Sequence, residues 1–203
     1  MSRLTLAKAV CAARRGVAAN VPFALAWDDA RLVGVLGDVD EEHALRVKVG
    51  KPSGRDQVRW HLDALVLSAL GESRELLAFA EFADGDIGPR ALRRHDPHAA
   101  RAALRWLIGL VRRGRLEPLP FRPSAAWAWR EKFIERGDAP LADDAAAQSW
   151  NSRAGGEGAD AWTALALRGA APFGDDAATL RFRALANDVF AALCDARVPG
   201  SAA

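Results

Sequence analysis

The sequence lacks tyrosine altogether and contains only two cysteines. Cys11 and Cys194 lie far apart and belong to no CxxC or Cys/His grouping, which excludes a zinc-finger motif and a disulfide framework. We therefore expect a protein of a reducing, cytoplasmic compartment. Lysine is also scarce, because it occurs only at Lys8, Lys48 and Lys51 and at Lys132.

Long hydrophobic runs are absent too. The first residues, MSRLTLAKAVCAARRG, are interrupted by Arg3, Lys8 and Arg14, so they contain no signal-peptide core, and no later segment approaches the roughly 20 apolar residues of a membrane span. We expect no export and no membrane partner. The net charge of +2 does not by itself indicate nucleic-acid binding, and a half-apolar chain of 203 residues suits one large domain or a domain with an appendage.

Hydrophobic periodicity predicts a mixed α/β structure in the first half of the chain. The expected order is α-β-β-β-α-β-α, which places a central mixed sheet in an α/β fold. In the third strand, alternation predicts that Leu45, Val47 and Val49 face a core while Arg46 and Lys48 face the other side. The expected helices are 4–16, 56–70 and 96–115, and the expected strands are 23–29, 31–39, 43–50 and 73–82.

The second half of the chain predicts a helical extension. We expect an α/β core over residues 1–115 and a mainly helical part over 116–203, ending in a helix over about 175–193. The pairs Asp143-Asp144 and Asp175-Asp176 precede alanine-rich runs and are expected to cap helices. Four tryptophans are expected to form a small satellite core rather than a base-stacking surface. They are Trp127, Trp129, Trp150 and Trp162.

The order α-β-β-β-α-β, with a Gly-x-apolar strand before a basic strand and a helix, resembles the PD-(D/E)xK nuclease fold. Four segments narrow the resemblance when taken in order: RVKVGKPSGRDQVRWHLDALVLSALG, PLPFRPSAAWAW, GGEGADAW and PFGDDAATLRFRALANDVFAAL. Together they resemble the C-terminal nuclease-like domain of RecC, the gamma subunit of exodeoxyribonuclease V (RecBCD). A complete RecC subunit is several times longer, so we expect the chain to be a part of one.

The resemblance implies that the nuclease positions are degenerate. An active member needs two carboxylates and a lysine around Mg²⁺, because the metal takes oxygen ligands and activates a water molecule. Here Gly37 stands at the first carboxylate position, and Arg46 stands at the acid position two residues before Lys48. The helical Gln-x-x-x-Tyr of active members becomes Asp56-x-x-x-Trp60. We therefore expect no catalytic residue and no bound metal, since Arg46 and Lys48 repel Mg²⁺.

The same resemblance implies a function. RecC-like C-terminal domains belong to a scaffold that holds RecB-like and RecD-like helicase subunits and guides DNA during double-strand-break repair by recombination. The implied partners are those subunits and linear double-stranded DNA ends or unwound single strands. Mg²⁺ and ATP are expected to be bound by the partner subunits, and the segment GEGAD lacks the lysine of a phosphate-binding loop.

Two interpretations of the basic residues stay open at this point. In the first, the basic residues contact DNA phosphates. In the second, they pair with nearby acidic residues and stabilise the fold. The candidates for DNA contact are Lys48, Lys51, Arg55 and Arg59. The candidate partners of Arg46 and Lys48 are Asp38, Asp40 and Asp56.

Other functions also remain as alternatives. One is a metal-dependent DNA exonuclease with a rearranged site that uses Asp38 and Lys48, with Asp40 or Asp56 as a further ligand. Another is a free-standing protein that binds a partner without DNA. Docking onto partners predicts an exposed apolar patch, for which Trp60 and Phe121 are candidates. His95 and His98 have a spacing that suits two metal ligands, but without a third we expect a solvated helix start.

Overall fold

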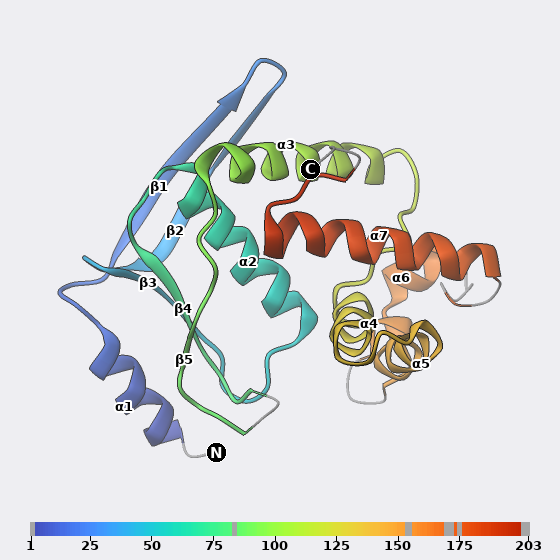
Figure 1. Cartoon of the computed structure of the whole chain (residues 1–203), viewed down its shortest axis with the longest axis horizontal. Coiled ribbons are helices and arrows are strands. Elements are labelled where there is room, and N and C mark those ends of the chain that lie inside the picture. Colours follow the sequence, from blue (N-terminus) through green and yellow to red (C-terminus); the bar gives the residue numbers. More distant parts are fainter. Residues whose placement is uncertain (1–2, 83–84, 153–155, 169–172, 174–175, 200–203) are drawn as a thin grey trace.

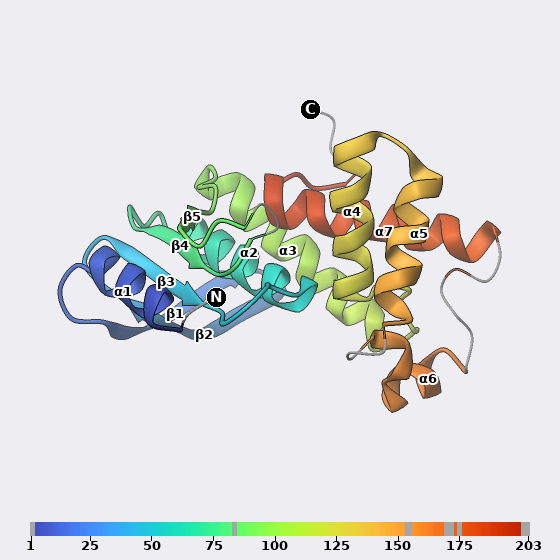
Figure 2. The ribbon, with the colours of Figure 1, turned by 90° about the horizontal axis from the view of Figure 1, so that it is seen from below.

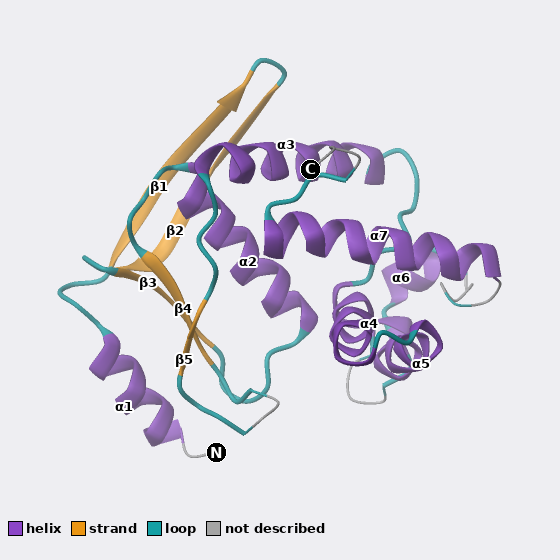
Figure 3. Ribbon diagram, viewed as in Figure 1, coloured by secondary structure: helices purple, strands orange, loops and turns teal. Residues whose placement is uncertain are grey.

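The computed structural model describes residues 3–82, 85–152, 156–168, 173 and 176–199, and it shows a five-stranded mixed sheet flanked by helices (Figure 1, Figure 3). The sheet has the order β1-β2-β3-β4-β5. The predicted α/β fold with a helical extension is confirmed. The elements of the first part are α1 (Arg3–Ala13), β1 (Ala19–Trp27), β2 (Ala30–Val39), β3 (His43–Val47), α2 (Gly54–Ala69), β4 (Glu75–Phe79), β5 (Pro89–Ala91) and α3 (Pro97–Gly114).

The strand pairings give the sheet its nuclease-like topology. Strands β1, β2 and β3 form an antiparallel meander, β3 and β4 run parallel, and β5 returns antiparallel to β4. A parallel pair needs a crossover connection, and α2 supplies it between β3 and β4. Strand β5 was not predicted, because its three exposed residues show no hydrophobic alternation.

The paired strands β3 and β4 are buried on both faces of the sheet. On one face Leu45 and Phe79 pack with Leu6 of α1, and on the other Ala44 and Leu76 join the main core. This alternation follows the two-residue period of a strand.

The prediction for the core face of β3 was only partly right. Leu45 is buried, but Val47 and Val49 are 47% and 56% exposed, and the strand ends at Val47. The cluster beneath α1 contains no residue of β3 beyond Leu45. The hydrophobic alternation therefore continues past the part of the sheet that a helix covers.

The starts of α2 and α3 follow local capping rules. Ser53 and Asp56 form a capping box at α2, in which each side chain accepts a hydrogen bond from the other residue's backbone N–H. Asp96 caps α3, and Pro97 occupies its first turn, where no intrahelical N–H bond is lost. These caps fix the direction in which each helix leaves the sheet edge.

In the second part of the chain, α4 (Pro123–Arg136) and α7 (Asp176–Asp195) pack against the helices of the first part, and α5 (Ala139–Trp150) packs against α4 (Figure 2). One continuous core joins residues of α2, α3, α4, α5 and α7. Trp129 and Trp150 are buried in this main core rather than in a satellite, and Trp127 packs against it, whereas Trp162 is 78% exposed and was predicted wrongly. The elements are α4 (Pro123–Arg136), α5 (Ala139–Trp150), the 3₁₀ turn η1 (Glu157–Ala159), α6 (Ala161–Ala166) and α7 (Asp176–Asp195).

The capping role expected of Asp143 and Asp144 is wrong. Helix α5 begins earlier, at Ala139, and its cap is Asp138, which accepts a hydrogen bond from the backbone N–H of Leu141 at 3.0 Å. Asp143 lies inside the helix and accepts from the indole N–H of Trp129 at 2.9 Å. It also pairs with Arg183 of α7. The expectation for Asp175-Asp176 falls on Asp175 and on the Asp176 side chain, which lie outside the described residues.

Among the helices that the structure describes, none combines the length and the apolar character required to cross a bilayer.

Candidate functional site

A polar pocket of about 520 Å³ opens between β2, β3 and α2. Gly37, Arg46, Asp56 and Trp60 all line it, so four of the five degenerate nuclease positions come together. The fifth, Lys48, adjoins them through an ion pair of 3.4 Å with Asp56.

The guanidinium of Arg46 is the dominant feature of this pocket. The residue is only 9% exposed. Its Nε donates to the Asp63 carboxylate at 2.6 Å, and its Nη1 donates to the backbone oxygens of Gly37 and Leu45, each at 2.8 Å. One side chain thus ties β2, β3 and α2 together through charge-assisted hydrogen bonds.

Asp63, the partner of Arg46, was missed at the sequence level. The expected partners were Asp38, Asp40 and Asp56, and none of them pairs with Arg46. The signal was present in the helix period, since Asp56, Trp60 and Asp63 are spaced i, i+4 and i+7 and therefore share one face of α2. A buried arginine on the adjacent strand requires an acid on that face.

For Lys48, the interpretation as a structural ion pair is supported by its contact with Asp56. Asp56 also accepts hydrogen bonds from the backbone N–H and the hydroxyl of Ser53, at 2.8 and 2.7 Å. Burial alone would raise the pKa of Asp56, but the bonds from Ser53 and the charge of Lys48 outweigh it and lower the pKa. Asp56 is therefore a charged carboxylate, and its Oδ2 receives the contacts from both Ser53 and Lys48.

Asp38 follows Gly37, and its carboxylate has a partner outside the pocket. The backbone of Asp38 adopts a left-handed φ of 54°. Its side chain pairs with Arg14, just after α1, at 3.1 Å. Asp38 borders the pocket through its position in β2, while its charge is neutralised at the rim.

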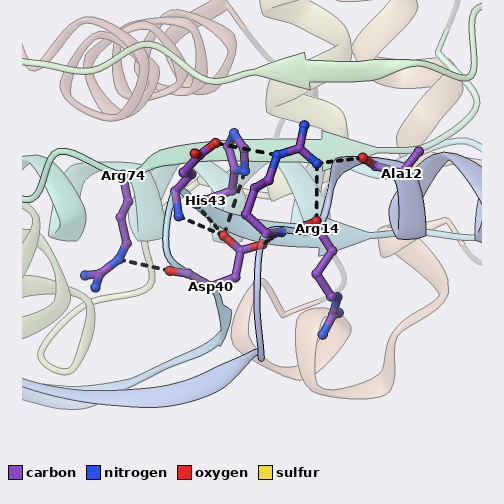
Figure 4. A network of polar contacts seen from close by, with 7 residues as sticks. Ala12, Arg14, Asp40, His43 and Arg74 are labelled. Atoms are coloured by element: carbon purple, nitrogen blue, oxygen red, sulfur yellow. Dashed lines mark hydrogen bonds and ion pairs between the residues drawn. The ribbon is translucent and has the colours of Figure 1, made fainter.

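Asp40 supports a loop through a network of polar contacts (Figure 4), and it is not among the residues that line the pocket. Its buried carboxylate accepts hydrogen bonds from the backbone N–H groups of Arg15, Glu42 and His43 at 2.8, 2.9 and 2.7 Å. Burial favours the neutral acid, yet these three donors prevail and lower the pKa of Asp40. Arg74 donates to the backbone oxygen of the same residue at 3.1 Å. Asp40 thereby fixes the β2–β3 turn to the end of α1.

The chemistry of the pocket does not fit a divalent cation. Mg²⁺ prefers oxygen ligands in an octahedral arrangement. The Gly37 carbonyl and the Asp63 carboxylate, which are oxygens of this pocket, already accept hydrogen bonds from Arg46. Among the described residues no three His, Cys, Asp or Glu side chains gather in a way that suits a metal, and this includes His95 and His98.

The remaining basic candidates differ in their surroundings. Lys51 and Arg59 are exposed, and neither makes an ion pair with a carboxylate in the described part of the chain. Arg55 approaches Glu157 at 3.7 Å. Trp60, expected at an exposed patch, is only 4% exposed, because α2 turns it into the core. Phe121 is partly buried.

Three segments that carried the family resemblance meet beside the pocket. The carboxylate of Glu157 is buried and accepts hydrogen bonds from the backbone N–H groups of Ser124 and Ala125 at 3.1 Å, which caps the start of α4. Gly54, at the start of α2, packs so closely that an added Cβ would lie 2.1 Å from the backbone oxygen of Pro123. These residues close one junction between α2, α4 and η1.

The comparisons with known proteins agree with this geometry. The family model described as the RecC C-terminal domain matches residues 3–134, which is more than half of the chain. No curated protein matches the chain. The chain therefore belongs to the family of RecC C-terminal domains, which are part of the RecC subunit of the RecBCD complex of DNA repair.

Proposed function

We propose that this chain is a non-catalytic scaffold and DNA-guiding element of a cytoplasmic RecBCD-type helicase-nuclease, acting in double-strand-break repair by recombination. Its nuclease-like core spans residues 1–115, and the helical part over 116–203 extends it. Mg²⁺ and ATP belong to the partner subunits. The observation that carries the proposal is the buried guanidinium of Arg46 at a position where a nuclease needs a carboxylate.

Arg46 opposes catalysis in two ways. A metal-dependent nuclease activates water on a cation held by carboxylates. Here a guanidinium stands in place of such a carboxylate, and it already pairs with Asp63 at 2.6 Å, so the pair offers a cation no net negative charge. Arg46 also engages the Gly37 and Asp63 oxygens. The same contacts support a scaffold role, because they lock β3 to α2 in the middle of the domain.

The alternative exonuclease that would use Asp38 and Lys48 gains no observation in its favour. Asp38 is paired with Arg14, and Lys48 is paired with Asp56. Recruiting either group to a metal would break its present ion pair.

Lys51 and Arg59 are the residues best suited to guide DNA, since their charges are exposed and unpaired within the described residues. Each phosphate contact releases counterions, so it adds roughly 0.9 to the magnitude of the slope of log affinity against log salt concentration for duplex DNA. We expect Lys51→Ala and Arg59→Ala to weaken binding of linear DNA and each to reduce that slope, in fluorescence anisotropy titrations at several salt concentrations. Arg94→Ala, at another exposed arginine, is the matched control. Equal binding by all three variants would contradict DNA guidance by this face.

Association with the helicase subunits tests the scaffold role. The purified chain is mixed with RecB-like and RecD-like subunits, alone and together, and the mixtures are separated by size-exclusion chromatography with light scattering. We expect the chain to co-elute with at least one subunit. Separate elution in every mixture would contradict the proposal.

A further inference from the structure

A groove of about 800 Å³ lies on another face from the degenerate pocket, with which it shares no residue. It runs between α3, the segment after it, the start of β2 and α7. In Figure 1 the β1–β2 hairpin reaches along α3, and α3 lies beside α7. Its volume is in the range of about 300–1,000 Å³ found for ligand pockets.

The interior of the groove is aliphatic. Its floor includes Leu104 and Leu193, which are fully buried, and its walls include Ile108 and Phe121. On the outer side Val111 lines the groove while it is 62% exposed. An apolar groove that is open to water and rimmed by polar residues suits a protein interaction site. Phe121 is thus the one of the two predicted patch residues that does lie at such a surface.

The rim of the groove is positive. Arg31, Arg112, Arg115 and Arg122 line it, and no acidic residue does. Arg112 is held by Asp29 at 2.9 Å. Arg31 and Arg115 are exposed and make no ion pair with any carboxylate that the structure describes. Arg122 is partly buried, and its charge helps to lower the pKa of Asp160. Arginine is enriched at protein interfaces because its planar group binds carboxylates through two hydrogen bonds.

The β1–β2 hairpin is fixed so that this rim stays in place. Asp29 at its tip pairs with both Arg105 and Arg112 of α3. Arg101 donates to the backbone oxygen of Ala26 at 2.7 Å and lies over the ring of Trp27. A preformed groove reduces the entropy lost when a partner binds.

We propose that this groove is a docking site for an acidic amphipathic helix of a partner protein, whose apolar side chains fill the groove while its carboxylates pair with Arg31, Arg115 and Arg122. An amphipathic helix presents apolar anchors at i, i+3, i+4 and i+7, which suits a groove of this kind. A single-stranded nucleic acid is less well matched, because bases stack on aromatic rings and Phe121 is the one aromatic residue in the lining. The inference deepens the proposed scaffold function by naming a docking surface and the chemistry of its occupant.

The test uses the whole chain and a fluorescein-labelled helical peptide with leucines at the anchor positions and glutamates on its flanks. Two further peptides carry lysines in place of the glutamates, or the same residues in scrambled order. Binding is measured by fluorescence anisotropy. We expect the acidic amphipathic peptide to bind at least tenfold more tightly than either control peptide.

Variants of the chain locate the binding surface. Val111→Glu should weaken binding of the acidic peptide at least tenfold, and Arg31→Glu or Arg115→Glu severalfold, with the arginine effect decreasing at high salt. Val33→Glu and Arg94→Glu are the matched controls, since Val33 is 61% exposed and neither residue lines the groove. All replaced residues are exposed, and circular dichroism checks that each variant is folded.

Four results would overturn the proposal. The first is equal affinity for the acidic and basic peptides, and the second is an unchanged affinity in Val111→Glu. The third is binding of an oligo-dT strand that Arg31→Glu and Arg115→Glu abolish while the peptide does not bind, which would make the groove a nucleic-acid surface. The fourth is self-association of the chain that Val111→Glu abolishes without any peptide binding. If the groove fails while the chain still co-elutes with helicase subunits, the scaffold function stands and only this docking site is lost.

Discussion

Removing the carboxylate of Asp63 should destabilise the fold strongly, because it leaves Arg46 charged and buried. The Arg46 side chain is 10% exposed and the Asp63 side chain 21%, and their atoms are 2.6 Å apart. Breaking a buried pair by removing one partner costs about 3–5 kcal/mol. Since Asp63 retains some contact with water, we expect Asp63→Ala to lower the free energy of unfolding by about 3 kcal/mol, near the lower end of that range.

The assay is urea denaturation followed by tryptophan fluorescence and circular dichroism. For a domain of this size, a loss of about 3 kcal/mol corresponds to a fall of roughly 6–12 °C in the melting temperature. The double variant Arg46→Met, Asp63→Leu removes both charges and is expected to lie within about 1 kcal/mol of the native chain, because apolar replacement of a buried pair is often neutral. A loss below about 1 kcal/mol for Asp63→Ala would refute the claim that Asp63 balances the Arg46 charge.

Three further predictions concern the core and its junctions. Gly54→Ala should lower the free energy of unfolding by about 2–3 kcal/mol, since the added Cβ would lie 2.1 Å from the Pro123 backbone. Gly109→Ala in α3, where a Cβ meets nothing within 4 Å, should instead raise it by up to about 1 kcal/mol. Urea midpoints compare the two variants, and equal effects would contradict the close contact at Gly54. Glu157→Ala should lower the free energy of unfolding by about 2–3 kcal/mol, because it removes the buried cap of α4. Asp138→Ala, which removes the exposed cap of α5, should lower it by only roughly 1 kcal/mol in the same titrations, and a reversed order would argue against the buried cap. Burial, with the charge of Arg130 in support, lowers the pKa of His61 to about 4, so the stability that His61 contributes is fully present above its unfolded pKa of about 6.5 and is lost as the pH falls toward about 4. The urea midpoint should therefore fall across that pH window, and His61→Gln should flatten the fall. An unchanged pH profile in the variant would refute the assignment.

Local sequence signals predicted the framework of the sheet well. The meander of three strands and the helices α2 and α3 followed from hydrophobic periodicity. The misses have tertiary causes. Strand β5 exists only because β4 offers it a pairing edge, and Trp162 is exposed because α6 turns it away from the core that receives Trp129 and Trp150.

The site was predictable in its positions but not in its contacts. The family pattern identified Gly37 and Arg46, and the structure brings both into one pocket. The helix period placed Asp63 on one face of α2 with Asp56 and Trp60, but the pairing with Arg46 also depends on how α2 lies across β3, which the sequence does not give. The Glu157 cap joins residues that are 33 and 32 positions apart, so no local rule could have revealed it.

The measurement that tests the central claim most directly is cleavage of labelled linear single- and double-stranded DNA by the purified chain, with Mg²⁺ or Mn²⁺. Lys48→Ala is the matched variant, because an active site of this fold requires the lysine. An active nuclease of the same fold serves as the positive control. The account predicts no cleavage above the level of Lys48→Ala for either metal. Metal-dependent cleavage by the native chain that disappears in Lys48→Ala would contradict it and would mean that a carboxylate such as Asp38 has replaced the missing ligands.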